Sequence, residues 1–436
     1  MRPILKPLVL ALALSMALAS GLAAEVQPLG PELQLNAEDT HRPRGPVALF
    51  AAGGGFTVVW ENEQLGIRAR RFSAAGDALG GDLDLVPNAR LAGSPSVGPV
   101  IYRSQPAAAG EASGGFVLTW SEERSIMHLA PFHEWREVQR RDVFAQRFNP
   151  AGQPLGARFR ISPSTGALHQ RPAVAGSGNE VLVVWEAADG EAGPGAADGI
   201  FARLINRDGE LLTGAVKLSG ATADKAARAA VAANADGTFL VAWDACCDGD
   251  RTGVFARLLD ADGAPLGAEF RLNSRTAGYQ NRPAVAANEA GEFLVAWQGS
   301  FEEVLDSRIW GQVVDAGGSL LGPELQVSLG EHGGDAQVAP AVAALPGGGW
   351  FVAWIDYRMP FPIGAFGVEL DALGSPAAAE IEINDRKVGS QFKIFVAARG
   401  QGDLLVTYEG FLTNTLNVVG RHLSSGGGRS QALTVR

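Results

Sequence analysis

Two histidines and a glutamate lie close together in one polar stretch of the chain, at His128, His133 and Glu134. Imidazole nitrogens and carboxylate oxygens are zinc ligands, but a helical zinc site reads His-Glu-x-x-His, and no third ligand is indicated here. We therefore predict no metal site at these residues. The histidines belong to a surface loop that is either structural or part of a binding surface.

Aromatic and charged side chains accompany the histidines and recur further along the chain. Trp135 and Arg136 follow them directly, and Asp356, Tyr357 and Arg358 open a second irregular stretch. An aromatic ring in such a loop either stacks on a sugar or packs the loop onto its scaffold, and packing is the commoner role. Together these residues form our candidate binding surface.

Three arginines recur at similar distances along the chain, at Arg171, Arg228 and Arg282. Guanidinium groups bind carboxylates and phosphates through paired hydrogen bonds, so three arginines brought together would hold an anion. A position that is repeated is more often part of a scaffold than of a site. We keep the three as a candidate anion cluster.

The only two cysteines, Cys246 and Cys247, are adjacent. Adjacent residues cannot staple distant parts of a chain, so packing must supply the stability. A vicinal disulfide, two free thiols and a link to another molecule are the alternatives. The nearby segment Asp248-Gly249-Asp250 lacks the ligand spacing of a calcium loop, so calcium is a candidate without motif support, and we expect no other cofactor.

These residues interrupt a repeat that sets their positions. An apolar segment that ends in an aromatic residue occurs seven times, and the terminal aromatics are Trp60, Trp120, Trp185, Trp243, Trp297, Trp354 and Tyr408. The spacing of about 54 to 65 residues exceeds that of helical repeats and suits propeller blades with long loops. The repeat therefore favours an array of sheets over a helical solenoid.

Each repeat reads as four strands joined by short turns, such as Asn234–Gly237 and Asp260–Gly263 in the fourth copy. The second strand is apolar on both faces, so the sheet must be covered on both sides. Closing the array into a ring provides that cover. The sequence predicts an all-β fold, a seven-bladed β-propeller of four-stranded antiparallel blades.

The ends of the chain carry two further signals. The fourth-strand pattern appears once too often, at Glu32–Asn36 and weakly at Ala432–Val435, so we predict that 32–36 pairs with the last blade and closes the ring. Residues 1–24 have a basic start, an apolar run and small residues before Glu25, which is typical of a secretory signal peptide. We expect residues 25–436 to form a single domain that is secreted or periplasmic.

The net charge of −11 and the pI near 5.2 argue against a nucleic-acid partner, because nucleic acids are bound through basic patches. No stretch after the signal is long and apolar enough to span a membrane. We expect a monomer.

The strand order, the apolar strand ending in Trp, a following strand of the Ile200–Leu204 (IFARL) type and a Gly-containing turn resemble exported bacterial β-propellers with sialidase-like, non-WD40 blade repeats. The resemblance covers residues 31–436. It implies the propeller fold and a sialidase-like hydrolase as a candidate activity. The standard aspartate box, Ser-x-Asp-x-Gly-x-Thr-Trp, is missing where the chain reads Asp260-Ala261-Asp262-Gly263-Ala264-Pro265, and no catalytic residue can be assigned from it.

Repeated charges predict a structural clasp. The residue after the core aromatic is acidic at Glu61, Glu186, Asp244 and Glu409, and a basic residue opens the first strand of the same repeats at Arg44, Arg171, Arg228 and Lys393. These positions are neighbours in an antiparallel pair, so each acid should meet the base of its own blade. The fifth repeat has Gln298 and Arg282 instead.

The leading functional hypothesis is a non-enzymatic binding or scaffold protein that recognises a protein or a glycan. The irregular stretches Ser121–Asp142, Asp244–Asp250 and Asp356–Pro362 are expected as loops on one face. The alternative is a secreted glycan-processing hydrolase, which would need two unpaired carboxylates in a central pocket, or Tyr279 or Tyr357 beside an arginine cluster. A structural module of a larger surface assembly is a third reading.

Overall fold

The computed structural model describes residues 26–37, 42–51, 53–90, 99–111, 113–130, 133–165, 167–188, 198–220, 225–246, 248–300, 307–329, 336–357, 363–385, 391–400, 402–411 and 415–425. All regular elements within these ranges are β-strands. No helix that could cross a membrane occurs among them.

Strand pairing arranges the described strands into seven successive antiparallel units. The first unit consists of β3 (Pro43–Phe50), β4 (Phe56–Asn62), β5 (Gly66–Phe72) and β6 (Leu83–Pro87). The second consists of β8 (Pro99–Gly110), β9 (Phe116–Ala130), β10 (His133–Phe148) and β11 (Pro154–Arg160), with β7 (Ala89–Arg90) at the edge. The third consists of β12 (Leu168–Ser177), β13 (Glu180–Ala188), β14 (Gly199–Asn206) and β15 (Val216–Lys217).

The fourth, fifth and sixth units repeat this order. They consist of β16 (Ala227–Ala233), β17 (Phe239–Cys246), β18 (Thr252–Leu259) and β19 (Phe270–Arg271); of β20 (Tyr279–Ala287), β21 (Phe293–Ser300), β22 (Ser307–Val314) and β23 (Leu320–Gln326); and of β24 (Gln337–Ala344), β25 (Trp350–Asp356), β26 (Gly364–Leu370) and β27 (Ile381–Glu382).

The seventh unit joins the two ends of the chain. Its strands β28 (Gln391–Arg399), β29 (Asp403–Phe411) and β30 (Leu416–Ser425) come from the C-terminal part, and β1 (Val26–Pro28) and β2 (Leu33–Gln34) pair with β30. The phenol of Tyr408 donates a hydrogen bond to the carboxylate of Glu32, and both side chains are buried. The N-terminal segment thus forms the outer edge of the last unit, whereas 432–435 lies outside the described residues.

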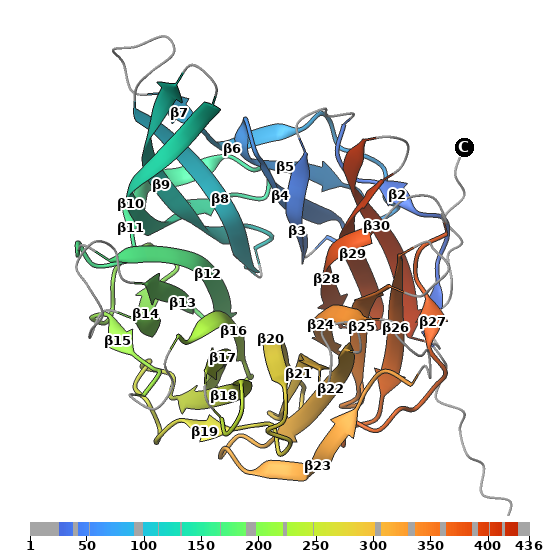
Figure 1. Ribbon diagram of the computed structural model, residues 1–436. Helices are drawn as coiled ribbons and strands as arrows, with labels where there is room; N and C mark the ends of the chain where they lie inside the picture. Colours follow the sequence, from blue (N-terminus) through green and yellow to red (C-terminus); the bar gives the residue numbers. More distant parts are fainter. Residues whose placement is uncertain are drawn as a thin grey trace, which may run out of the picture.

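The units follow one another around a central opening, with the first strand of each unit innermost (Figure 1). The blue β2 lies beside the red β30, where the ring closes (Figure 1). This is the architecture of a β-propeller, and it confirms the fold class that the sequence predicts.

Packing between units explains why the second strands are apolar on both faces. Trp243 of β17 packs in a cluster with Leu182 of the preceding unit, while Leu240 of the same strand packs with Phe293 of the following one. In the described part of the chain, seven such clusters lie between successive units, one of them between the last unit and the first. The core is therefore a closed series of interfaces.

The interpretation of Ser121–Asp142 as a loop is wrong. β9 and β10 pair from Phe116 opposite Phe148 to Ala130 opposite His133, with one register shift between Val138 and Arg140, and they form a long hairpin (Figure 1). The high charge of this stretch suggested a loop, but charges pair across the two strands: the guanidinium of Arg141 donates to the carboxylate of Glu123, its partner in register.

Candidate functional site

Every inner strand carries a β-bulge near the end at which the chain enters it. The strand register shifts at the same position in all seven described units. One bulge residue per unit has a positive φ: Gly45 (57°), Gln105 (56°), Arg171 (48°), Arg228 (53°), Arg282 (56°), Ala339 (54°) and Lys393 (35°). Six of the seven are not glycine, so the conformation is imposed by the surroundings.

Two features of the sequence support the bulge. Proline follows the bulge residue in five units, at Pro46, Pro106, Pro172, Pro283 and Pro340. Proline has no N–H for the strand ladder and is tolerated at bulges. A positive φ costs a non-glycine residue about 1–2 kcal/mol, so another interaction must hold it.

That interaction comes from the preceding unit. The N–H of Gln105 donates to the carboxylate of Glu61 at 2.9 Å, and the N–H of Gly45 donates to Glu409 at 2.7 Å. Arg282 is held in the same way, because its N–H donates to the carboxylate of Asp244. In these units the residue after the core aromatic thus links neighbouring blades, which the sequence alone did not reveal.

The same acids also meet cations of their own blade. The ion pairs are Arg171 with Glu186 (3.1 Å), Arg228 with Asp244 (3.0 Å) and Lys393 with Glu409 (3.7 Å). The predicted clasp is therefore present in these three units. In the first unit it is wrong, since Arg44 pairs with Glu63 at 3.7 Å instead of Glu61.

Two of these acids, Asp244 and Glu409, have raised pKa values. Burial raises the pKa of Asp244 above its ordinary value, and the hydrogen bond from Arg228 opposes the shift without cancelling it. Burial likewise raises the pKa of Glu409, against the charge of Lys393. For Arg228, the hydrogen bond and charge of Asp244 outweigh burial and raise its pKa. These carboxylates are held inside the scaffold between two blades.

Arg282 differs from the other arginines of the ring. The acid of its own blade is replaced by Gln298, and no carboxylate in the described part of the structure forms an ion pair with its guanidinium. Partial burial lowers the pKa of Arg282, and the positive charges of Arg228 and Arg171 add to the effect. The structure therefore brings the predicted anion cluster together.

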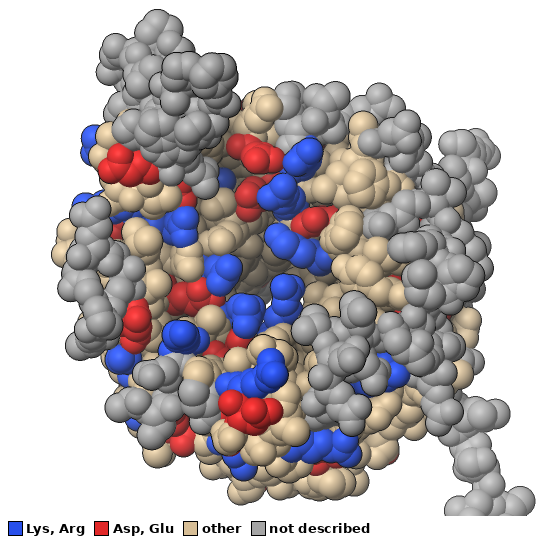
Figure 2. All heavy atoms as spheres, in the orientation of Figure 1, with Lys and Arg blue, Asp and Glu red and all other residues tan. Residues whose placement is uncertain are grey.

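We call Arg171, Arg228, Arg282 and Lys393 the cationic ring. Figure 2 shows Lys and Arg side chains gathered around the central opening on one face of the molecule. The side chain of Arg171 retains 47% of its exposure, so a ligand can reach the ring from solvent. A local cationic site on a chain of net charge −11 favours small or local anionic groups over a polyanion that touches the whole surface.

One predicted binding residue from the sixth blade joins this site and another does not. Tyr357 directly follows β25 and lies close enough to Arg282 to affect its pKa. Asp356, predicted as an exposed loop residue, is instead the last residue of β25 and fully buried, where it accepts a hydrogen bond from Gln337 Nε2 at 3.1 Å. Arg358 lies outside the described residues.

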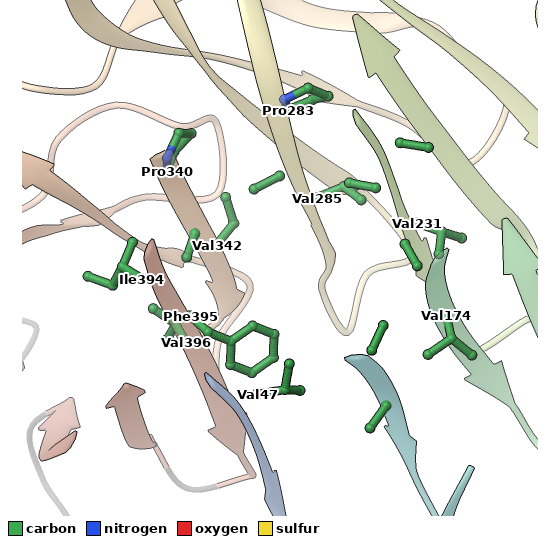
Figure 3. Close-up of a pocket in the computed structure, with 17 residues that line it drawn as sticks. Val47, Val174, Val231, Pro283, Val285, Pro340, Val342, Ile394, Phe395 and Val396 are labelled. Atoms are coloured by element: carbon green, nitrogen blue, oxygen red, sulfur yellow. The ribbon is translucent and has the colours of Figure 1, made fainter. Parts of the chain in front are cut away.

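Below the cationic ring, the central opening continues as a narrow passage that we call the shaft. It has a volume of about 240 Å³. All its lining side chains are apolar (Figure 3): Val47, Ala107, Ala108, Ala173, Val174, Ala229, Ala230, Val231, Pro283, Ala284, Val285, Pro340, Ala341, Val342, Ile394, Phe395 and Val396. All seven inner strands contribute, so the shaft follows from the repeat itself.

A second cavity of about 450 Å³ lies at the opposite end of the inner strands, among the turns that lead to the second strands. Asn234 donates to the carbonyl of Gly291, and Asn288 to that of Gly348, so these amides tie neighbouring blades together. Their polar groups serve the scaffold, which leaves the cationic ring as the stronger candidate site.

The other predicted binding residues lie on the β9–β10 hairpin, apart from the cationic ring. His128 is opposite Trp135, Arg136 is opposite Met127, and His133 begins β10. His128 is seven residues beyond Ser121, or roughly 23 Å along an extended strand. Only the backbone of these residues is described, and it places them on a projecting hairpin.

The segment after β17 is fastened to the end of its own blade and to the chain that enters the next one. Cys246 is disulfide-bonded, and the chain has only one other cysteine, Cys247. The carboxylate of Asp248 accepts a hydrogen bond from Asn273 Nδ2 at 2.6 Å, and that of Asp250 accepts one from the N–H of Gly278 at 2.9 Å. Among the described residues, no group of three or more His, Cys, Asp or Glu side chains is arranged to hold a metal ion.

A buried histidine lies two residues before Arg171 and predicts a pH dependence. His169 Nδ1 accepts a hydrogen bond from Trp185 Nε1 at 3.1 Å, so Nε2 carries the proton and faces Thr165 Oγ1 at 2.9 Å. Burial lowers the pKa of His169 below its ordinary value, because the ring must stay neutral to accept from the indole.

We expect this histidine to destabilise the fold in mild acid. The folded-state pKa of His169 is below the unfolded value near 6.5. Its contribution to the free energy of unfolding is therefore complete above about pH 6.5 and is lost as the pH falls towards the folded-state pKa. Each pKa unit by which the folded state lowers the value corresponds to about 1.4 kcal/mol in the free energy of unfolding. Urea unfolding should show that the free energy of unfolding falls less between pH 8 and pH 5 for His169→Gln than for the wild type.

His422 allows a second, independent test of the same effect. It is also partly buried, and burial lowers its pKa in the same direction. His422→Gln should therefore remove a separate part of the pH dependence, and the double variant should remove both. If His169→Gln had the wild-type slope, the lowered pKa of His169 would not be a source of the acid sensitivity.

No model of a known protein family matches the chain, and a search of curated proteins finds no match. Solved structures do match it. A protein of unknown function from Dyadobacter fermentans has a TM-score of 0.52 and 10% identity, covering 92% of this chain and 100% of its own. A polysaccharide lyase of family PL25, an ulvan lyase bound to -[GlcA(1-4)Rha3S]-, has a TM-score of 0.53 and 8% identity, covering 91% and 96%.

The NanB sialidase from Streptococcus pneumoniae has a TM-score of 0.51 and 8% identity, covering 76% of this chain and 68% of its own. At 8–10% identity, these likenesses show the fold alone. They agree with the β-propeller derived from strand pairing. The function must come from the residues of this chain.

Proposed function

We propose that the protein recognises an acidic glycan at the cationic ring, with a sugar carboxylate or sulfate bound by Arg282 and its neighbours. The observation that carries this proposal is Arg282, a guanidinium at the mouth of the central opening without a carboxylate partner among the described residues. A guanidinium that offers two parallel donors matches a planar carboxylate.

The neighbouring arginines add positive charge to the site, but each of them is already ion-paired with a carboxylate. Arg171 and Arg228 each have an acid of their own, and these acids are also engaged by backbone N–H groups. Among the described residues, the ring therefore has a fixed framework with one guanidinium that forms no ion pair, so little reorganisation is needed when an anion binds. These features support recognition at the central opening instead of on three separate loops.

The comparisons support the choice of ligand. A polysaccharide lyase bound to a GlcA-containing oligosaccharide and a sialidase share the fold. Because the likeness concerns the fold alone, it only guides the choice of compounds to test. From the sequence we expected a protein or a glycan as partner; the proposal keeps the glycan and moves its site.

A glycan-processing hydrolase is the second candidate. Tyr357 lies near Arg282, which is the arrangement that the hydrolase hypothesis requires. Tyr357 would act as the nucleophile. Tyr279 is less suitable, because its hydroxyl accepts a hydrogen bond from Arg251 at 2.6 Å.

The experiment titrates the mature chain, residues 25–436, with uronic-acid oligosaccharides and with neutral oligosaccharides of the same length, with and without calcium. We expect the acidic series to bind and the neutral series not to, with weaker binding at higher salt because the contact is ionic. Equal binding of both series would contradict the proposal.

A product assay on each bound glycan separates the two candidates. Binding without turnover supports recognition alone. Turnover that is lost in Tyr357→Phe supports the hydrolase. We further propose that the protein acts in the periplasm or outside the cell, on the basis of the signal-like residues 1–24.

A further inference from the structure

The side chains that line the shaft are all apolar, up to the residue next to the cationic ring. Arg282 is followed on the same strand by Pro283, Ala284 and Val285, all of which line the shaft. The change from charge to apolar surface therefore occurs within one residue of the ring. Two other inner strands show the same order, since Arg228 precedes Ala229 and Lys393 precedes Ile394.

The side chains of the shaft offer a water molecule no hydrogen bond, so only backbone groups of the inner strands can hold water there. Apolar surface that remains open to solvent usually marks a binding surface. Figure 3 shows the valine side chains and Phe395 directed into the same space.

The size of the shaft suits a small apolar group. A dry apolar cavity of about 150 Å³ is enough to bind benzene, and the shaft has about 240 Å³. An alkyl chain or an aryl ring would fit, whereas a folded protein segment would not. The adjoining cations require that the same ligand carry a negative charge at one end.

We propose that the ligand is an amphipathic anion: an acidic sugar whose carboxylate lies in the cationic ring and whose apolar substituent enters the shaft. This inference rests on the proposed function and specifies the class of acidic sugar. It predicts that neither the charge nor the apolar group alone gives the full affinity.

The test uses four compounds that vary the two features independently: methyl and octyl β-glucuronide, and methyl and octyl β-glucoside, each below its micelle-forming concentration. We expect octyl glucuronide to bind at least about tenfold more tightly than methyl glucuronide, because each methylene buried in the shaft contributes roughly fourfold. It should also bind at least about tenfold more tightly than octyl glucoside, which lacks the charge.

Polar substitutions in the shaft locate the apolar group. Val231→Thr combined with Val285→Thr keeps the side-chain shape but adds hydroxyls to the wall, so it should reduce the advantage of octyl over methyl glucuronide. The affinity for methyl glucuronide should not change. Val216→Thr is the matched control, because Val216 is similarly half-buried but lies on the outer strand β15.

The outcomes separate this inference from the proposed function. Equal affinity for the two glucuronides, both above the glucosides, would overturn the inference and leave acidic-glycan recognition intact. An octyl advantage that survives the double valine substitution would also overturn it, since the chain would bind elsewhere. If the glucuronides bind no better than the glucosides, the proposed function itself fails.

Discussion

Arg282→Gln is expected to weaken the binding of methyl β-glucuronide by about 10- to 150-fold, while the protein remains folded. The substitution removes a charge-assisted pair of hydrogen bonds, which corresponds to about 1.5–3 kcal/mol. Arg282 has no carboxylate partner in the described structure, so its loss leaves no buried acid unpaired. Isothermal titration of wild type and variant at the same ionic strength measures the effect.

Two further variants sharpen this result. Arg282→Lys keeps the charge but loses the planar fork, so it should fall between wild type and Arg282→Gln. Arg257→Gln makes the same change of net charge on β18, where the guanidinium donates to the carbonyls of Gly267 and Leu218. It should bind like the wild type; an equal loss would mean that net charge, and not the ring, governs affinity.

Trp243→Ala is expected to lower the free energy of unfolding by about 3–5 kcal/mol. The indole is fully buried between the third and fourth blades, where Leu182 and Val184 contact the same cluster. Removing it leaves a cavity in one of the interfaces that close the ring. Urea unfolding followed by circular dichroism at pH 8 measures the change.

Leu266→Ala is the matched surface control. Leu266 is 56% exposed, so its truncation should change the free energy of unfolding by no more than about 0.5 kcal/mol. Trp243→Phe should cost less than Trp243→Ala, because most of the interface remains filled. A cost below 1 kcal/mol for Trp243→Ala would show that the blades do not depend on this packing.

The fold was predictable because it is built from a repeat. A strand that is apolar on both faces and ends in Trp, as Phe239–Trp243 does, must be sandwiched, and seven copies of it define a ring. The long hairpin of the second blade was missed for the opposite reason. Its charges pair across the strands, as Arg141 and Glu123 do, so it lacks the apolar alternation that marks a strand.

The candidate site was predictable only in part. Repetition identified the arginines, and it correctly explains Arg171 and Arg228 as partners of acids. The exception was visible as Gln298, which replaces the acid beside Arg282. The bulges were not anticipated, because one extra residue in a strand leaves no periodic trace. The recurrent Xaa-Pro step, as at Arg282-Pro283, was the signal that could have revealed them.

The location of a bound acidic sugar tests the central claim most directly. A crystal structure of residues 25–436 with methyl β-glucuronide would show where the carboxylate lies. We expect electron density at the mouth of the central opening, with both carboxylate oxygens within hydrogen-bonding distance of the Arg282 guanidinium. Density for the sugar on the β9–β10 hairpin or at the outer edges of the blades, with an empty cationic ring, would contradict it.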